Sequence, residues 1–343
     1  MSLFRQEIAE QPAVVQRLLD QAAAITRIGS ALRERRPVGV MIAARGSSDH
    51  AAVYAKYLLQ QRNRIPVALA APSLYTHYAA PPKVEGFCVI GISQSGSAPD
   101  VTAVLADARR QGSITVAISN DPDSRLAREA DFVVPLLAGA ERSVPASKTY
   151  MATLMAIALL SQAIDPEPGF ESALRAVPEA LERALACEPQ AAGAARFLEA
   201  GRMIVLGRGF NLATAEELAL KISETSYALA RAWSAADFPH GPIALIESGF
   251  PIVVIEADSP TREDTRRLAA RLRDRSCTLV QVADGTAPLE GASACVRIES
   301  GLPESLSPLP LAVAAQLLAA ELARARGLDP DRPRSLDKIT RTW

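Results

Sequence analysis

Short, uninterrupted apolar runs alternate with segments of helical periodicity along most of the chain. Five of these runs predict strands in the first half, over residues 38–43, 65–70, 87–92, 114–119 and 132–135. Apolar residues three and four positions apart predict helices between most of them, and also over 11–36, 148–163 and the stretch leading to Arg196. This alternation is typical of a doubly wound parallel sheet.

The second half of the chain repeats the first at an offset of 163 residues, which carries Arg45 onto Arg208 and Phe87 onto Phe250. Strands are predicted at the matching places, over 203–207, 251–256, 278–283 and 295–298. The economical explanation is a duplicated α/β domain. We therefore predict two flavodoxin-like, three-layer domains with their connections: a helical segment 1–33, domain 34–165, linker 166–196, domain 197–328 and tail 329–343.

A polar, hydroxyl-rich turn over residues 91–100 follows a predicted strand and precedes a helical pattern. Free N–H groups and the dipole at a helix N-terminus favour an anion, and Ser93, Gln94 and Ser95 add donors, so the turn predicts a phosphate site. An ordinary strand–helix turn with capping serines explains the same residues about equally well.

The matching turn of the second half carries Glu256 and Asp258 in place of the serines. Two carboxylates there would repel a phosphate. We therefore expect a single anion site in the duplicated chain, with the second copy free to supply other groups.

The second half is richest in candidate chemistry along a predicted helix that a Thr214–Glu217 capping box would open. Glu217, Lys221 and Glu224 share one face of this helix, and a solvated ladder of ion pairs is the simpler reading of such a triplet. Small and aromatic neighbours predict that Glu224 is buried, as suits a general base.

His240 lies between two prolines and a glycine in a short, stiff loop, which suits a proton carrier. The other histidines, His50 at a helix start and His77 in a loop, are more typical of structural or surface positions. The segment 330–341 is basic, and a disordered tail is its simplest interpretation.

Composition narrows the class of partner. The 343 residues are 49% hydrophobic and 5% aromatic, with a net charge of −1, so no broad basic field favours nucleic acid or a membrane. A small molecule is the expected ligand. The four cysteines show no C-x-x-C spacing, and neither a secretory leader nor a spanning apolar run is visible, so we expect a soluble, cytoplasmic protein.

Several motifs, in one order, resemble the sugar isomerase (SIS) family, and in particular the isomerase half of glucosamine-6-phosphate synthases. They are Ser93-Gln94-Ser95-Gly96, Leu206-Gly207-Arg208-Gly209, Ala219-Leu220-Lys221-x-x-Glu224-x-Ser226-Tyr227, His240-Gly241-Pro242-x-Ala244-Leu245-Ile246 and Pro333-Arg334-x-Leu336-x-Lys338. The resemblance covers almost the whole chain, including Glu7-Ile8-x-Glu10-Gln11-Pro12. The run Ala44-Arg45-Gly46-Ser47-Ser48-Asp49, with Pro99, is similar to stand-alone type II glucosamine-6-phosphate deaminases.

The resemblance implies roles for individual residues. Phosphate-binding positions match Ser47, Ser48, Ser93, Gln94 and Ser95, and a substrate-lining position matches Val144. Glu224 matches the base that moves a proton between C1 and C2, and Lys221 and Lys338 match active-site lysines. His240 matches a ring-opening histidine, which in the synthase comes from the neighbouring subunit of a homodimer. Ala98 and Asp337 depart from the synthase pattern, which has threonine and alanine there, and they leave substrate detail open.

The implied reaction converts glucosamine 6-phosphate to fructose 6-phosphate and ammonia, by aldose–ketose isomerisation and imine hydrolysis, without metal or redox cofactor. The synthase's glutaminase domain is not found in this sequence, so no glutamine-derived ammonia is expected. Three alternatives stay open: an isomerase or deaminase for another amino-sugar phosphate such as galactosamine 6-phosphate, a deglycase for fructosamine phosphates, and a non-catalytic sugar-phosphate sensor.

Overall fold

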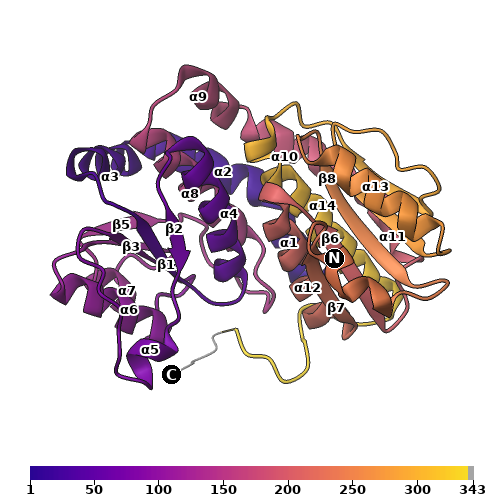
Figure 1. The fold of residues 1–343 in the computed structure, drawn as a ribbon, viewed down its shortest axis with the longest axis horizontal. Helices are drawn as coiled ribbons and strands as arrows, with labels where there is room; N and C mark the ends of the chain where they lie inside the picture. Colours follow the sequence, from indigo (N-terminus) through magenta and orange to yellow (C-terminus); the bar gives the residue numbers. More distant parts are fainter. Residues whose placement is uncertain (339–343) are drawn as a thin grey trace. The chain divides into compact units, whose positions relative to one another are not determined.

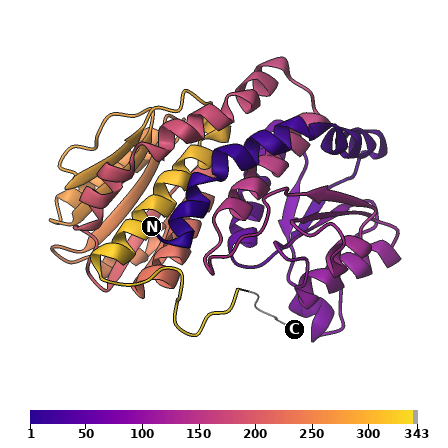
Figure 2. The same ribbon diagram turned by 180° about the vertical axis from the view of Figure 1, so that it is seen from behind.

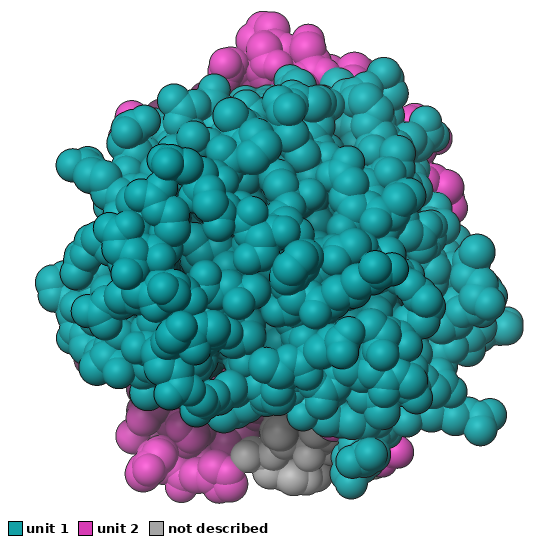
Figure 3. All heavy atoms as spheres, turned by 90° about the vertical axis from the view of Figure 1, so that its right-hand side faces the viewer, with its two compact units in different colours: residues 1–12, 142–147, 176–335 teal, residues 13–141, 148–175, 336–343 magenta. Residues whose placement is uncertain are grey.

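The computed structural model describes residues 1–338, and the last five residues of the predicted tail, 339–343, lie outside the described residues. The chain forms two compact units, coloured teal and magenta in Figure 3, and neither unit is a continuous stretch of the chain. Unit 1 consists of residues 1–12, 142–147 and 176–335, and unit 2 of residues 13–141, 148–175 and the tail from 336. The predicted domain bounds remain predictions.

Unit 2 is built on a five-stranded parallel sheet with the order β2-β1-β3-β4-β5 (Figure 1). Its strands are β1 (Val40–Ala43), β2 (Val67–Leu69), β3 (Cys88–Ile92), β4 (Ile114–Ser119) and β5 (Phe132–Pro135). Every residue of β3 and β4 is buried, because helices cover both faces of a parallel sheet. The apolar runs therefore predicted these strands to within two residues.

Two groups of helices form the outer layers of unit 2 (Figure 1). On one face, α4 (Ser47–Arg62) packs against β1, β2 and β3, and α3 (Ala22–Arg35) packs against β5. Helix α8 (Lys148–Ile164) packs against both of these helices. The other face packs against α6 (Pro99–Arg110) and α7 (Arg125–Arg128), next to α5 (Ser73–Thr76). Helix α9 (Pro168–Arg175) packs on α8.

The sheet of unit 1 has the order β10-β9-β8-β6-β7, which is the order of the first sheet repeated. Its strands are β6 (Arg202–Gly207), β7 (Leu229–Ser234), β8 (Pro251–Ala257), β9 (Thr278–Asp284) and β10 (Ala294–Ile298). All neighbours are parallel in both sheets. The predicted fold class, a duplicated three-layer α/β domain, is confirmed.

One face of the second sheet carries α11 (Glu188–Ala195), α12 (Leu212–Ser226) and the long α14 (Pro308–Ala325), which Figure 2 shows in yellow. Helix α10 (Val177–Leu185) packs on α14, and α13 (Arg262–Arg273) covers the opposite face. Helix α1 (Leu3–Ala9) also contacts α14. No helix within residues 1–338 is long and apolar enough to cross a lipid bilayer.

Three local predictions were wrong, and one strand was missed. The helix expected over 11–36 is interrupted at Gln21, whose φ of −110° and ψ of 17° end α2 (Gln11–Asp20) before α3 begins. The helix expected before Arg196 is three short helices, α9, α10 and α11. Thr214 does not open α12 as a capping residue, because the helix begins at Leu212 after Asn211. Strand β7 was not predicted, because arginine interrupts its apolar pattern at this partly exposed sheet edge.

The tail is ordered in its described part, contrary to the simplest interpretation of its sequence. The Asp331 carboxylate accepts hydrogen bonds from the first two N–H groups of α1, those of Leu3 and Phe4. The Arg334 guanidinium lies 4.4 Å from the ring centroid of Tyr227, and the Arg334 N–H donates to the Tyr227 hydroxyl at 3.1 Å. These contacts attach the tail to unit 1 before it reaches residue 336.

Candidate active site

The strand order places the first half of the candidate site at the carboxyl edge of the first sheet. Strands β1 and β3 are neighbours, and the order reverses at this point, where ligands bind in open α/β sheets. Helix α4 begins at Ser47 after β1, and α6 begins at Pro99 after β3. The Arg45 Nε lies 2.8 Å from the Asp100 Oδ2, so a buried carboxylate ties these two turns together.

The turn after β3 is held by its own hydrogen bonds. The Ser93 N–H donates to the Ile118 carbonyl on β4 at 3.1 Å, and the Ser97 N–H donates to the Ser95 hydroxyl at 3.3 Å. Gly96 has a φ of 60°, and a Cβ added there would lie 2.0 Å from the Ser124 hydroxyl oxygen. Glycine is therefore required for both conformation and space.

A polar cavity of about 330 Å³ opens beside this turn, within the range of small-molecule sites. It is lined by Gln94, Ser95, Ser97, Asn120, Asp121, Glu141 and Lys338. The structure thus brings two of the predicted phosphate-binding residues together with the predicted tail lysine. Ser93 is buried behind the turn, and Ser47 and Ser48, in the first turn of α4, are not among the lining residues.

Sequence reasoning missed Glu141, whose carboxylate lies at the centre of these contacts with a side chain that is 0% exposed. It accepts hydrogen bonds from Gln94 Nε2 at 2.9 Å, from Lys338 Nζ at 2.7 Å, and from the Thr149 N–H and hydroxyl at 3.0 and 2.8 Å. The sequence signal that could have identified Glu141 is its place as an acidic residue just before the Val144 motif. Its ion-pair partner, Lys338, lies 197 positions away in the sequence.

Electrostatics near the turn after β1 involve Asp49 in the first turn of α4. Burial raises the pKa of the Asp49 carboxyl above its ordinary value, and the neighbouring His50 and Arg45 lower it by less. This carboxyl therefore holds its proton more tightly than a free aspartate.

The predicted acid–base residues of unit 1 form a buried charge cluster on α12. Lys221 and Glu217 have side chains that are only 1% exposed, and the Lys221 Nζ lies 2.6 Å from a Glu224 oxygen and 3.5 Å from a Glu217 oxygen. The interpretation of this triplet as a solvated ladder was therefore wrong. Glu224 is 20% exposed rather than fully buried, so its carboxylate is held by an ammonium and remains accessible.

Packing fixes this part of α12 against its neighbours. The Thr225 hydroxyl donates to the Lys221 carbonyl at 2.7 Å and lies near the Ala319 carbonyl of α14. Tyr227 adopts a left-handed conformation with a φ of 53° and ends the helix. Glu224 therefore lies in a helical turn that the Thr225 contacts fix in place, just before the helix ends at Tyr227.

His240 ends a single 3₁₀ turn, η2 (Phe238–His240), after the edge strand β7. Its N–H donates to the Asp237 carbonyl at 2.9 Å, and Gly241 follows with a φ of 153°. The imidazole of His240 is exposed on this chain.

Val144, the predicted substrate-lining residue, lies half-buried in a loop of unit 1. The Glu7 carboxylate of α1 accepts hydrogen bonds from the Arg142 and Ser143 N–H groups and from the Ser143 hydroxyl. At the other end of the loop, the Ser147 carbonyl accepts from Gln316 of α14. The N-terminal motif thus holds the loop that carries Val144.

The turn of the second sheet that matches the serine-rich turn is closed. The Arg266 guanidinium contacts a Glu256 oxygen at 2.8 and 2.9 Å, and the remaining cavity holds only about 10 Å³. A phosphate has no room there, which agrees with the expectation of a single anion site.

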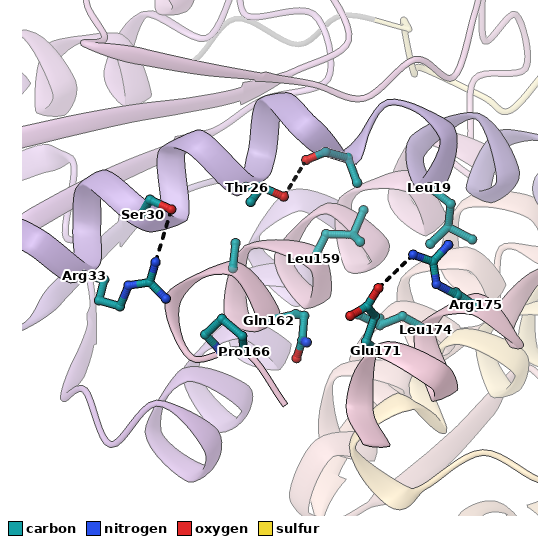
Figure 4. Close-up of a pocket in the computed structure, with 12 residues that line it drawn as sticks. Leu19, Thr26, Ser30, Arg33, Leu159, Gln162, Pro166, Glu171, Leu174 and Arg175 are labelled. Atoms are coloured by element: carbon teal, nitrogen blue, oxygen red, sulfur yellow. Dashed lines mark hydrogen bonds and ion pairs between the residues drawn. The ribbon is translucent and has the colours of Figure 1, made fainter. Parts of the chain in front are cut away.

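A second hollow of unit 2, of about 290 Å³, lies between α3, α8 and α9 (Figure 4). Four of its polar side chains form two pairs, Arg33 with Ser30 and Arg175 with Glu171. None of the predicted site residues lines it. We therefore place the candidate site at the serine-rich turn and not here.

Comparison with known proteins gives consistent matches. The model of the SIS domain matches twice, over residues 36–163 and 196–325. An isomerizing glutamine–fructose-6-phosphate aminotransferase of Gloeobacter violaceus is 34% identical over 97% of this chain, and the chain spans 57% of that protein's length. A crystal structure from Silicibacter pomeroyi DSS-3, provisionally named a phosphosugar isomerase, is 32% identical and covers 96% of this chain and 100% of its own, with a TM-score of 0.88.

A more distant structure shares the fold. The glucosamine-6-phosphate deaminase of Thermotoga maritima has a TM-score of 0.77 and 21% identity, and the match covers 99% of this chain and 100% of that one.

Proposed function

This chain belongs to the SIS domain family, and from that membership we propose that it is a phosphosugar isomerase whose reaction is the deamination of glucosamine 6-phosphate. The observation that carries the proposal is the cavity beside the serine-rich turn. There Gln94 and Ser95 offer donors to a phosphate, and Lys338 brings an ammonium to the same cavity. A sugar phosphate fits both features.

The residues of unit 1 supply proton transfer in this proposal. Phosphate in the turn anchors C6, and His240 assists opening of the sugar ring. Glu224 then takes the proton from C2 and returns it to C1 through an enolamine, while Lys221 stabilises the carboxylate. General acid–base catalysis of this kind contributes roughly 10²–10⁴-fold.

Hydrolysis completes the reaction. The ketimine at C2 takes up one water, and its carbon–nitrogen bond breaks to give fructose 6-phosphate and ammonia. We further propose a homodimer in which His240 serves the neighbouring active site, since its imidazole is exposed on the single chain.

One assay separates this proposal from its rivals. The protein is incubated with glucosamine 6-phosphate, galactosamine 6-phosphate and fructosyl-amine phosphates, and ammonia, amine and fructose 6-phosphate are measured. Equal amounts of ammonia and fructose 6-phosphate from glucosamine 6-phosphate support the deaminase. Turnover of another substrate alone assigns that substrate, and tight binding without turnover identifies a sensor.

A further inference from the structure

The Glu141 carboxylate joins two elements that the proposed function uses separately, the phosphate turn and the tail lysine. We propose that Glu141 is a positioning residue that docks Lys338 against the serine-rich turn and so assembles the anion site. The inference rests on the proposed function only for its effect on turnover. The docking itself follows from the contacts within unit 2.

Thr149, at the start of α8 (Lys148–Ile164), fixes the Glu141 carboxylate through two hydrogen bonds. The carboxylate Oε1 accepts the Thr149 N–H at 3.0 Å, and its Oε2 accepts the Thr149 hydroxyl at 2.8 Å. A free N–H group in a first helical turn and the positive end of the helix dipole both favour a negative charge. These two bonds fix the orientation of Glu141 without any help from the tail.

The same oxygen then receives one donor from each of the two elements. Gln94 Nε2 and Lys338 Nζ lie 2.9 and 2.7 Å from Glu141 Oε2. Because both bonds end on one atom, the position of the turn and that of the tail lysine depend on each other. An anion that accepts from the Gln94 amide leaves the ammonium in place as the charge partner of the carboxylate.

The tail needs such an anchor in this part of the chain. Residues 334–337, just before Lys338, are exposed. Ordering exposed residues costs conformational entropy, which a charge-assisted bond to a buried carboxylate can offset. With a side chain that is 0% exposed, Glu141 in turn requires strong donors, because an unpaired buried charge is costly.

The first test needs no substrate. Native wild-type protein and the Glu141→Gln variant are treated briefly with an amine-acetylating reagent, and acetylation of Lys338 is measured by mass spectrometry relative to the exposed Lys83. Glutamine cannot accept the ammonium as a carboxylate does. We expect Lys338 to be acetylated about tenfold faster, the low end of what a hydrogen bond to a charged group contributes.

Asp131→Asn is the matched control. Asp131 accepts the N–H and the hydroxyl of Thr115, just as Glu141 accepts those of Thr149, but it is not among the cavity residues. This variant should leave Lys338 acetylation unchanged. Equal acetylation of Lys338 in wild type and Glu141→Gln would overturn the proposal, as would an equal rise in Asp131→Asn.

Turnover gives a second, independent readout. Glu141→Gln should lower kcat by about 10²-fold, the order expected when a catalytic group is misplaced by about 1 Å. Glu141→Asp, which keeps the charge, should recover part of the rate. Glu141→Gln combined with Lys338→Met should lose no more than Lys338→Met alone, and additive losses would contradict a role exerted through Lys338. A wild-type protein inert toward every sugar phosphate would refute the proposed function, while the acetylation result would still decide whether Glu141 docks the lysine.

Discussion

Replacing Lys221 by methionine tests whether the charges on α12 form a balanced, buried cluster. The change removes the ammonium that lies 2.6 Å from Glu224 and 3.5 Å from Glu217 and leaves a chain of similar length. Breaking a buried ion pair by removing one partner costs about 3–5 kcal/mol, because the other charge stays behind.

The structure places the expected loss at the low end of that range. Glu217 is 1% exposed and loses a cation 3.5 Å away, whereas Glu224 is 20% exposed and keeps some contact with water. We therefore expect a loss of about 3 kcal/mol. With about 2–4 °C per kcal/mol for a unit of this size, the melting temperature should fall by roughly 6–12 °C.

The assay is thermal unfolding followed by far-UV circular dichroism at pH 7. The double variant Lys221→Met/Glu217→Gln should recover part of the loss, because it removes both charges of the Glu217–Lys221 pair. Arg175→Met is the control, since the Glu171–Arg175 pair has the same i,i+4 spacing but side chains that are 52% and 70% exposed. This control should change stability by less than about 0.5 kcal/mol. A Lys221→Met variant as stable as wild type would refute the balanced cluster.

Three further predictions concern the turn, the Val144 loop and the thiols. Ser95→Ala should raise KM for a sugar phosphate about tenfold, as expected for a hydrogen bond to a charged group, and an unchanged KM would count against the cavity as the phosphate site. Glu7→Gln should lower the free energy of unfolding by about 1–3 kcal/mol in urea titrations, because the Ser143 hydroxyl and two N–H groups lose a charged acceptor; a loss below about 0.3 kcal/mol would argue against this anchor. Burial raises the pKa of Cys88 and of Cys187 to about 12, so both thiols should resist a disulfide reagent at pH 8 in the native protein. Four fast-reacting thiols would contradict their burial.

The sheets were predictable because burial on both faces leaves a direct trace in the sequence. Runs such as 87–92 and 114–119 are apolar throughout and became the central strands β3 and β4. The edge strand β7 escaped because it is partly exposed and carries Arg231 among its apolar residues.

The site was predictable only in parts, for a physical reason. Motifs identified Ser95, Gln94 and Lys338, but the residue that joins them, Glu141, acts across 197 positions of chain. Helical spacing placed Glu217, Lys221 and Glu224 on one face without indicating whether that face met water or the core. The structure shows Glu217 and Lys221 buried, and burial depends on tertiary packing that helical spacing does not encode.

The central claim is that Glu224 moves the proton between C1 and C2, and one comparison tests it most directly. Turnover and equilibrium binding of glucosamine 6-phosphate are measured for wild type and Glu224→Gln. Glu216→Gln serves as the control. Glu216 is on the same helix, but it directly precedes Glu217 in sequence and therefore does not share the face that carries Glu217, Lys221 and Glu224. We predict that Glu224→Gln loses about 10²–10⁴-fold in kcat and keeps its affinity, while Glu216→Gln keeps both. A Glu224→Gln variant that retained the wild-type rate would contradict this assignment.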